Sequence, residues 1–422
     1  MAEVFEFGPL RSDCAEASTK LFEQPKVAQA IQFIEIDQPN RIKDQVELTE
    51  CAAPPFKEEK RGELFAGMLE KAGLNEVRID GTGNVIARRK GSGSGPTLVV
   101  AAHLDSVFPE STPIKVREEN GVYYAPGISD DTGGLANLLQ VVKALNKYEI
   151  ETEGDIVFVG TVGEEGNGDL RGAKALWREK NDYDGFIAID SAAPTRILKG
   201  SVGCKRYRVK FSSPGGHSLH KFGIVASPIH ALCRAGALLD NVVAPTDPKC
   251  TFNIGVVKGG TSVNAIATNA EFELDIRAMN QEALENFTAK ILPLFEQAVK
   301  ECNEKWGVTE ENSVKLEIVQ IGDRPAGINK PDSPVVHAAY AAMQKVGIEL
   351  KKFGFAATDQ NVPLAMGVPA TTLGAGGSED FNHSVKESWN SKDAFLGPQL
   401  SFLTALILVG MKGVTKPVLE KR

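Results

Sequence analysis

The sequence predicts an α/β fold, with helices on both faces of a sheet, interrupted by a smaller α+β domain. Three observations support this prediction. Strand-like and helical patterns alternate from about residue 25 to 198, as in layered α/β proteins. The pattern changes near residue 199, and the alternation resumes after about residue 317. A chain of 422 residues also exceeds the usual size of a single hydrophobic core.

The first part of the chain contains short apolar runs separated by helical patterns. Residues 84–90 and 97–102 are predicted as neighbouring strands. Residues 134–147 are predicted as a helix, because their apolar side chains recur at helical spacing. Residues 155–159 and 186–189 are mostly apolar, which is typical of parallel strands buried on both faces.

The middle of the chain follows a different pattern. Residues 205–211, 251–257 and 271–277 alternate polar and apolar side chains, as half-exposed strands do. Residues 228–242 and 281–306 are predicted as amphipathic helices. Two helices on one side of a short antiparallel sheet would form a compact α+β domain.

The α/β pattern then resumes with a predicted helix at 335–346 and a predicted strand at 370–373. The simplest interpretation is one discontinuous domain with another inserted into it. We expect the discontinuous domain to comprise residues 1–198 and 316–422, and the inserted domain to comprise residues 199–315.

Composition argues against several kinds of partner. A net charge of −8 leaves no basic surplus to neutralise phosphates, so we expect no nucleic-acid partner. The apolar segment 400–411 is too short to cross a bilayer, so we expect no membrane partner. The first residues lack the basic and apolar regions of a signal peptide. Six scattered cysteines are typical of free thiols in a reducing compartment, so a cytoplasmic location is expected.

His103 and Asp105 follow an apolar strand and lie two residues apart. If the strand continues, both side chains point to the same side. His103 could then bind a metal ion while Asp105 holds the other ring nitrogen. An isolated His-x-Asp is more often structural, but other metal-binding side chains follow in the sequence.

Asp130 and Asp131 immediately precede the predicted helix at 134–147. An aspartate at this position is commonly a helix cap. The small residues and glycines around Asp130 would also let its carboxylate approach a metal ion closely, and such a carboxylate could bridge two cations.

Glu164 and Glu165 follow the strand at 155–159, between glycines. Two adjacent glutamates at the end of a buried strand would repel each other without a counter-ion. One could bind metal while the other faces the substrate as a general base. The alternative is a pair of exposed loop glutamates.

Asp190 and His383 complete the candidate site. Asp190 closes the strand at 186–189, although a lone aspartate there is often only a turn residue. His383 follows the glycine-rich run 374–377 and would supply a second imidazole from the resumed α/β region.

Taken in order, these motifs resemble those of the co-catalytic dizinc metallopeptidase family of peptidase T, glutamate carboxypeptidase, aminoacylase and acetylornithine deacetylase. The resemblance is strongest to the peptidase T-like branch. It extends from about residue 32 to the end of the chain. It implies a zinc-exopeptidase-like mixed sheet flanked by helices, with an inserted α+β lid and dimerisation domain. The motifs are His103-Leu104-Asp105, Asp130-Asp131, Glu164-Glu165-Gly166, Asp190 and His383.

The resemblance implies a role for each of these residues. His103 and Asp190 would bind one divalent ion, Glu165 and His383 the other, and Asp130 would bridge the two. Zinc suits the mixed nitrogen and oxygen ligands, and manganese or cobalt would also fit.

The resemblance also assigns residues beyond the metal ligands. Glu164 would be the general base acting on a water activated by the two metals, and Asp105 would support His103. The peptide bond between Asp130 and Asp131 is expected to be cis.

In the inserted domain, the resemblance implies that His217 stabilises the oxyanion and that Asn264 and Arg277 contact the substrate. Arg324, in the resumed α/β region, is a further candidate for substrate binding. A homodimer formed through the inserted domain is expected. Considered alone, Arg277 would more often be a surface salt-bridge partner.

Position 190 is an aspartate rather than a glutamate. This is a further resemblance, to the branches of the family that remove N-terminal residues. The run Thr358-Asp359-Gln360-Asn361 also resembles those branches. We therefore expect a metallopeptidase that acts on short peptides at the amino end, as an aminopeptidase, tripeptidase or dipeptidase does. The alternatives are an N-acyl amino acid deacylase or carboxypeptidase-like amidohydrolase, and a metal-containing binding or sensor protein without activity.

Overall fold

The computed structural model describes residues 8–178 and 182–422. The chain divides into two compact units. The main unit comprises the residues up to Ser201 together with Ile328–Arg422, and the inserted unit comprises Val202–Gly327.

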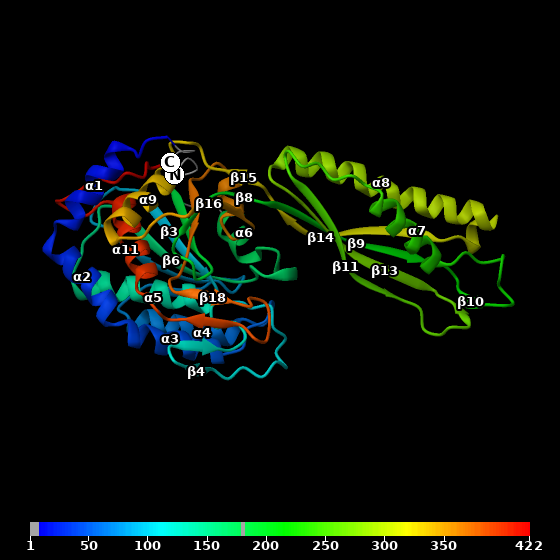
Figure 1. Cartoon of the computed structure of the whole chain (residues 1–422), viewed down its shortest axis with the longest axis horizontal. Coiled ribbons are helices and arrows are strands. Elements are labelled where there is room, and N and C mark those ends of the chain that lie inside the picture. Colours follow the sequence, from blue (N-terminus) through cyan, green and yellow to red (C-terminus); the bar gives the residue numbers. More distant parts are fainter. Residues whose placement is uncertain (1–7, 179–181) are drawn as a thin grey trace. The chain divides into compact units, whose positions relative to one another are not determined.

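The main unit contains a mixed sheet, which has nine strands in the part of the chain that the structure describes (Figure 1). Its central strands β6, β3, β7 and β17 are parallel neighbours, and β2 and β1 add antiparallel strands on the β6 side. The order is β1-β2-β6-β3-β7-β17-β8-β15, with β16 beside β8. The strands are β1 (Val77–Ile79), β2 (Val85–Arg89), β3 (Thr97–His103), β6 (Asp155–Thr161), β7 (Gly185–Ile189), β8 (Arg196–Ser201), β15 (Gly327–Ile328), β16 (Lys352–Ala356) and β17 (Ala370–Leu373).

Helices cover both faces of this sheet, as predicted. Alternate side chains of β3 belong to two different hydrophobic clusters, because successive side chains of a strand point to opposite faces. Leu98 and Val100 pack into the larger cluster, whereas Val99 and Ala101 pack against α6 and α10. The helices are α1 (Ser12–Phe22), α2 (Pro25–Ile36), α3 (Gln38–Glu50), α4 (Glu59–Lys71), α5 (Thr132–Lys147), α6 (Arg171–Arg178), α9 (Pro334–Val346), α10 (Asn361–Ala365) and α11 (Leu396–Val409).

The beginning of the chain differs from the sequence prediction. We expected strands and helices to alternate from about residue 25, but α1 to α4 all precede the first strand. The amphipathic faces of these helices are buried against the larger cluster, which includes Leu21, Ile34 and Phe65.

A second, antiparallel sheet lies within the main unit, in the order β18-β19-β5-β4. It joins the region around residue 380 to the strand that leads toward Asp130. The pairing places Ser388 opposite both Asp380 and Tyr124. The strands are β4 (Arg117–Glu119), β5 (Val122–Tyr124), β18 (Ser378–Asp380) and β19 (Ser388–Asn390).

The inserted unit is an antiparallel sheet in the order β11-β13-β9-β14, with α7 and α8 packed against it (Figure 1). It has its own hydrophobic core, which includes Phe211, Phe272 and Phe295. A two-stranded ribbon, β10 with β12, completes it. Its elements are β9 (Gly203–Ser212), β10 (Gly216–His217), α7 (Pro228–Asp240), β11 (Cys250–Gly259), β12 (Ala265–Ile266), β13 (Asn269–Ala278), α8 (Gln281–Trp306) and β14 (Lys315–Arg324).

The inserted unit is longer than the expected range of 199–315. The difference arises because β14 pairs with β9 along most of its length, from Lys315 opposite Ser212 to Arg324 opposite Cys204. The prediction that this segment belongs to the resumed α/β region is therefore wrong, and its alternating side chains fit a half-exposed strand.

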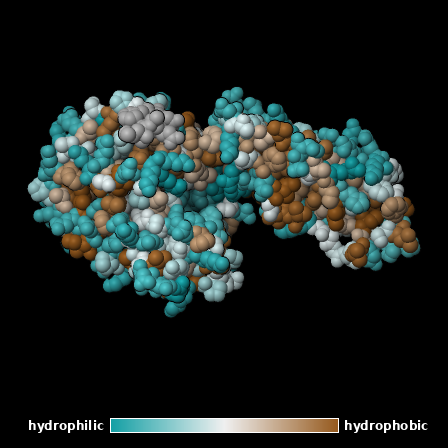
Figure 2. Space-filling view, in the orientation of Figure 1, coloured by the Kyte–Doolittle hydropathy of each residue, from teal (hydrophilic) through white to brown (hydrophobic). Residues whose placement is uncertain are grey.

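The surface of the inserted unit carries hydrophobic side chains among hydrophilic ones (Figure 2). Val256 and Val257 are exposed on β11, a strand at the edge of the described sheet. Within the described residues, no helix combines the length and apolar composition that crossing a bilayer requires. The cysteines, all of which are described, are free thiols as expected.

Candidate metal centre

Three parallel strands end together where the candidate residues lie. His103 is the last residue of β3 and pairs with Thr161 at the end of β6. Asp190 follows the end of β7, which runs parallel to β3 on its other side. Glu164 and Glu165 follow β6 after a short turn. Because parallel strands present their carboxyl ends at the same edge of a sheet, side chains from distant segments meet there.

Asp130 lies between the two imidazoles. Its Oδ1 atom is 2.9 Å from Nε2 of His103, and its Oδ2 atom is 3.1 Å from Nε2 of His383. Nε2 of His383 is also 2.9 Å from Oε1 of Glu165. The Asp130 carboxylate therefore uses each oxygen toward a different histidine.

The potential ligand atoms form overlapping groups, each with atoms within 4.8 Å of one another. One group contains His103, Asp130 and Asp190, and another contains Asp130, Glu165 and His383. Two donors, each ~2.0–2.1 Å from one tetrahedral zinc ion, lie about 3.3–3.4 Å apart. The imidazole and carboxylate atoms already have nearly this separation, so the donor set fits two ions that share Asp130.

Asp131 has a different role from its neighbour. One of its oxygens accepts a hydrogen bond from the backbone nitrogen of Gly134, which caps α5, and the other accepts one from the backbone nitrogen of His103. The two adjacent aspartates thus divide the two functions that the sequence left open: Asp131 caps the helix and Asp130 faces the histidines. The Asp130–Asp131 peptide bond is cis, as expected.

Asp105 contacts His103 differently from what the sequence predicted. Nδ1 of His103 is 3.0 Å from the backbone oxygen of Asp105 and 3.6 Å from its carboxylate. The carboxylate instead accepts hydrogen bonds from the backbone nitrogens of Glu164 and Glu165, at 2.9 and 2.8 Å. Because Nδ1 can donate its proton to the Asp105 carbonyl, Nε2 is the ring nitrogen that would be available to a metal ion beside Asp130.

Glu164 and Glu165 are both buried, so the alternative of two exposed loop glutamates is wrong. Glu165 faces His383. Glu164 forms a third potential ligand group with Glu165 and His103. Both backbone amides are held by Asp105, which fixes the turn that carries the pair.

The carboxylates that cluster at the site change the pKa values of the side chains around them. Hydrogen bonds to Asp130 and Glu165 raise the pKa of His383 to about 11. Burial alone would lower the pKa of His103, but Asp105 and Asp130 outweigh it and raise that pKa well above its ordinary value. Burial, with the nearby Asp130 charge, raises the pKa of Asp190 to about 7. Without a metal ion, both imidazoles hold their protons at neutral pH.

Two buried arginines near the site were not predicted from the sequence. Arg61 on α4 donates from Nη1 to the backbone oxygen of Leu104, at 2.8 Å. Arg41 on α3 donates to the backbone oxygens of Gly133 and Ala375. Each binds backbone that flanks the candidate ligands. The helical pattern alone could not distinguish these arginines from surface residues, because their partners are distant in sequence.

Two glutamates that contact the Asp130 loop were also missed. Glu387 is buried and accepts hydrogen bonds from three backbone nitrogens, those of Gly127, Ser129 and Asp130. Burial raises the pKa of Glu387 to about 7. Glu379 accepts a hydrogen bond from Oγ of Ser129. The sequence offered one sign of their role, which is that each lies close to His383 along the chain.

Four other predicted residues lie in the inserted unit. His217 and Asn264 lie close together, because β10 pairs with β12 and the backbone nitrogen of Ser218 donates to the backbone oxygen of Asn264. The His217 side chain is exposed, and its ring packs against that of His220. The roles predicted for His217 and Asn264 toward the substrate stay predictions.

Arg277 and Arg324 share one cross-strand row of the inserted sheet. Each is opposite Cys204 of β9, one from β13 and the other from β14. Residues directly opposite one another in a sheet share a face, so both arginines lie on the same face. Nε of Arg277 is 2.7 Å from Oδ2 of Asp275, which is the salt bridge expected of a structural arginine. A substrate-binding role for either arginine stays a prediction.

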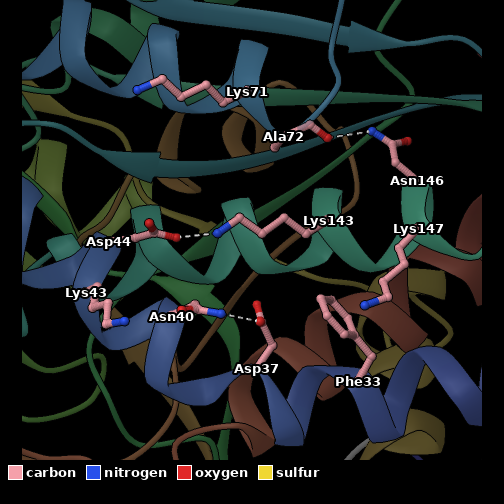
Figure 3. Close-up of a pocket in the computed structure, with 10 residues that line it drawn as sticks. All are labelled: Phe33, Asp37, Asn40, Lys43, Asp44, Lys71, Ala72, Lys143, Asn146 and Lys147. Atoms are coloured by element: carbon pink, nitrogen blue, oxygen red, sulfur yellow. Dashed lines mark hydrogen bonds and ion pairs between the residues drawn. The ribbon is translucent and has the colours of Figure 1, made fainter.

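An open groove lies elsewhere on the main unit, among α2, α3, α4 and α5 (Figure 3). Its volume is about 570 Å³. Lys143 is paired with Asp44, and Lys147 lies over the ring of Phe33. The groove does not bring an imidazole together with carboxylates, as the sheet edge does, so it is not the candidate metal centre.

Comparison with known proteins agrees with this geometry. The model of Peptidase family M20/M25/M40 matches residues 99–408. Carboxypeptidase G2 from Pseudomonas sp. is 26% identical over 251 residues, which cover 56% of this chain and 58% of that protein. Aminopeptidase PepT from Bacillus cereus has a TM-score of 0.69 at 23% identity, covering 87% of this chain and 97% of that one. A tripeptidase from Staphylococcus aureus has a TM-score of 0.71 at 21% identity, with the same coverage.

At these identities, the two solved structures establish a shared fold, and the predicted fold class is confirmed. The family model covers well over half of the chain, which confirms the predicted family. This protein therefore belongs to Peptidase family M20/M25/M40 and is a metallopeptidase.

Proposed function

We propose that this protein is a metal-dependent exopeptidase that hydrolyses short peptides at the amino end. The observation that supports it best is the Asp130 carboxylate, with one oxygen toward His103 and the other toward His383. A carboxylate shared in this way suits two adjacent cations, which is a common arrangement in aminopeptidases.

In this proposal, His103 and Asp190 would hold one ion, Glu165 and His383 would hold the other, and Asp130 would be shared by both. When bound, the ions polarise the scissile carbonyl and lower the pKa of water. Zinc is the first choice for mixed imidazole and carboxylate ligands, and manganese or cobalt would also be accepted.

Glu164 is the proposed general base. Its carboxylate is buried beside His103 and Glu165, and its backbone is held by Asp105. From this position it can take a proton from the attacking water and return it to the leaving amine. A binding or sensor protein would have no need of a proton acceptor here, which argues against that alternative.

Two observations favour the amino end. Position 190 is an aspartate, as in the peptidase T-like branch that the sequence resembles. The fold is also shared with an aminopeptidase and a tripeptidase. The relationship to carboxypeptidase G2 keeps a carboxypeptidase-like amidohydrolase or an N-acyl amino acid deacylase as the second candidate.

We also propose that the protein forms a homodimer through its inserted unit. The edge strand β11 has unpaired backbone groups on one side in the described sheet, and it exposes Val256 and Val257. An exposed apolar edge strand favours pairing with another strand. A second copy of the chain would supply that strand.

Replacing Glu164 by Gln tests the general base. The amide has nearly the same size but cannot accept the proton, so kcat should fall by about 10²–10⁴-fold while two metal ions stay bound. Steady-state kinetics and metal analysis of the same samples measure both. The exposed Glu16→Gln should retain native kinetics. Native kcat in Glu164→Gln would remove Glu164 from the mechanism.

Metal binding should release protons at neutral pH. Both imidazoles must lose a proton to bind metal, and their raised pKa values mean that they are protonated in the metal-free site. Asp190, whose pKa is about 7, is also partly protonated there, so we expect release of between about two and three protons as both ions bind at pH 7, and tighter binding as pH rises. Calorimetry in buffers with different ionisation enthalpies measures this number. An enthalpy independent of the buffer would contradict the proposed ligands.

Blocked peptides separate the two candidate reactions. Acetylation of the amino terminus should lower kcat/KM for di- and tripeptides by at least about 100-fold, since a site for a free amine loses a charged hydrogen bond. Free and acetylated peptides of the same sequence provide the comparison, with N-acyl amino acids as a third group. Turnover of the acyl compounds alone would establish the deacylase instead.

Val257→Lys tests the dimer. A lysine at this exposed position of β11 should disfavour strand pairing and shift the protein toward monomer in sedimentation velocity experiments. Val243→Lys is the matched control, because Val243 is 92% exposed and lies outside β11. A native chain that stays monomeric at high concentration would refute the proposal.

A further inference from the structure

We propose that Glu379 and Glu387 are positioning residues that hold the loop Gly127–Asp130 and thereby place the Asp130 carboxylate between the two metal sites. This inference rests on the proposed function, since it concerns the same pair of ions. Neither glutamate belongs to the potential metal-ligand groups of the described residues. Both act on the loop through hydrogen bonds.

Glu387 binds the loop with both of its oxygens. Oε2 accepts from the backbone nitrogen of Gly127 at 2.9 Å. Oε1 accepts from the backbone nitrogens of Ser129 and Asp130, at 2.9 and 3.2 Å. The side chain is only 1% exposed. Burying a carboxylate costs free energy unless hydrogen bonds compensate for the lost water. Here the compensating hydrogen bonds all come from the loop that carries the proposed bridging ligand.

Glu379 binds the same loop from another strand. Its Oε2 atom accepts from Oγ of Ser129 at 2.6 Å and from the backbone nitrogen of Ala192 at 2.8 Å. Ala192 lies two residues after Asp190, a proposed ligand of one ion. Glu379 therefore connects the loop of the bridging aspartate to the loop of Asp190.

The small antiparallel sheet fixes both glutamates beside the loop. β18 contains Glu379, and Glu387 immediately precedes β19. β19 pairs with β5, and the backbone nitrogen of Ala125 donates to the backbone oxygen of Glu387 at 3.2 Å. The strand that leads into the loop and the segment that carries Glu387 are thus joined directly.

A shift of Asp130 would affect both ions, because each of its oxygens faces a different histidine. Groups that orient metal ligands typically change metal affinity by about 10–100-fold when they are replaced. The glutamates should therefore affect metal binding itself, beyond any effect on folding.

The number of oxygens that each glutamate uses makes the inference testable. Glu379→Gln can keep both hydrogen bonds, because its single amide oxygen can replace Oε2. Glu387→Gln cannot, because its amide nitrogen must face a backbone N–H. The two variants therefore differ in the number of loop hydrogen bonds that they can keep, and the difference between their metal affinities reports hydrogen bonding at the loop.

We expect Glu387→Gln to weaken binding of both ions by about 10–100-fold, and Glu379→Gln to weaken it less. Competition of the metal-free protein with a chelating dye for Zn²⁺ gives the affinities. The absorption spectrum of the Co²⁺-loaded protein reports ligand geometry, and it should change in Glu387→Gln. Asp184→Asn is the control. Asp184 is also buried and accepts backbone N–H groups from Thr97 and Arg422, at the opposite end of β3.

If Glu387→Gln does not fold, Glu379→Ala replaces it in the comparison. The alanine leaves Oγ of Ser129 and the nitrogen of Ala192 without an acceptor, so it should bind Zn²⁺ more weakly than Glu379→Gln does. Equal affinities for that pair, or native affinity and a native Co²⁺ spectrum in Glu387→Gln, would overturn the inference. Failure of the native chain to bind two ions would instead refute the proposed function.

Discussion

The site depends on one constraint: several carboxylates and the His103 imidazole are buried together at the carboxyl edge of a parallel sheet, and the more exposed His383 imidazole lies against them. Asp130 is central, because its two oxygens face different histidines. Burial, together with the nearby Asp130 charge, raises the pKa of Asp190 to about 7, and hydrogen bonds to the carboxylates raise the pKa values of both imidazoles, which therefore hold their protons. Divalent cations in place of those protons would neutralise the same charges more completely. The electrostatics of the metal-free site thus favour metal binding.

Backbone amides hold this arrangement together. Asp105 binds the amides of Glu164 and Glu165, Asp131 binds those of His103 and Gly134, and Glu387 binds those of the Asp130 loop. Each of these carboxylates is buried, and each fixes a turn that carries a proposed ligand or base. Acidic residues near the site therefore serve two purposes. Some belong to the cluster of proposed ligands, and others hold the backbone that carries the cluster.

The two units of the chain divide the candidate residues. The main unit contains all of the proposed metal ligands and Glu164, whereas the inserted unit contains His217, Asn264, Arg277 and Arg324. Each unit has its own hydrophobic core, so each is a folded body in its own right. This division is consistent with a family in which one catalytic scaffold serves different substrates. The metal cluster indicates the class of reaction, and the choice of substrate depends on residues outside it.

The fold class, the family and the residues that meet at the sheet edge could all be predicted from the amino-acid sequence. These depend on local periodicity and on short motifs at strand ends, which a single chain displays directly. The three-dimensional contacts were needed to separate the roles of Asp130 and Asp131, to find the partners of the Asp105 carboxylate and to show that Arg41, Arg61 and Glu387 are buried. They also assign β14 to the inserted sheet. These features depend on hydrogen bonds and strand pairings between distant segments, and no local pattern specifies such partners.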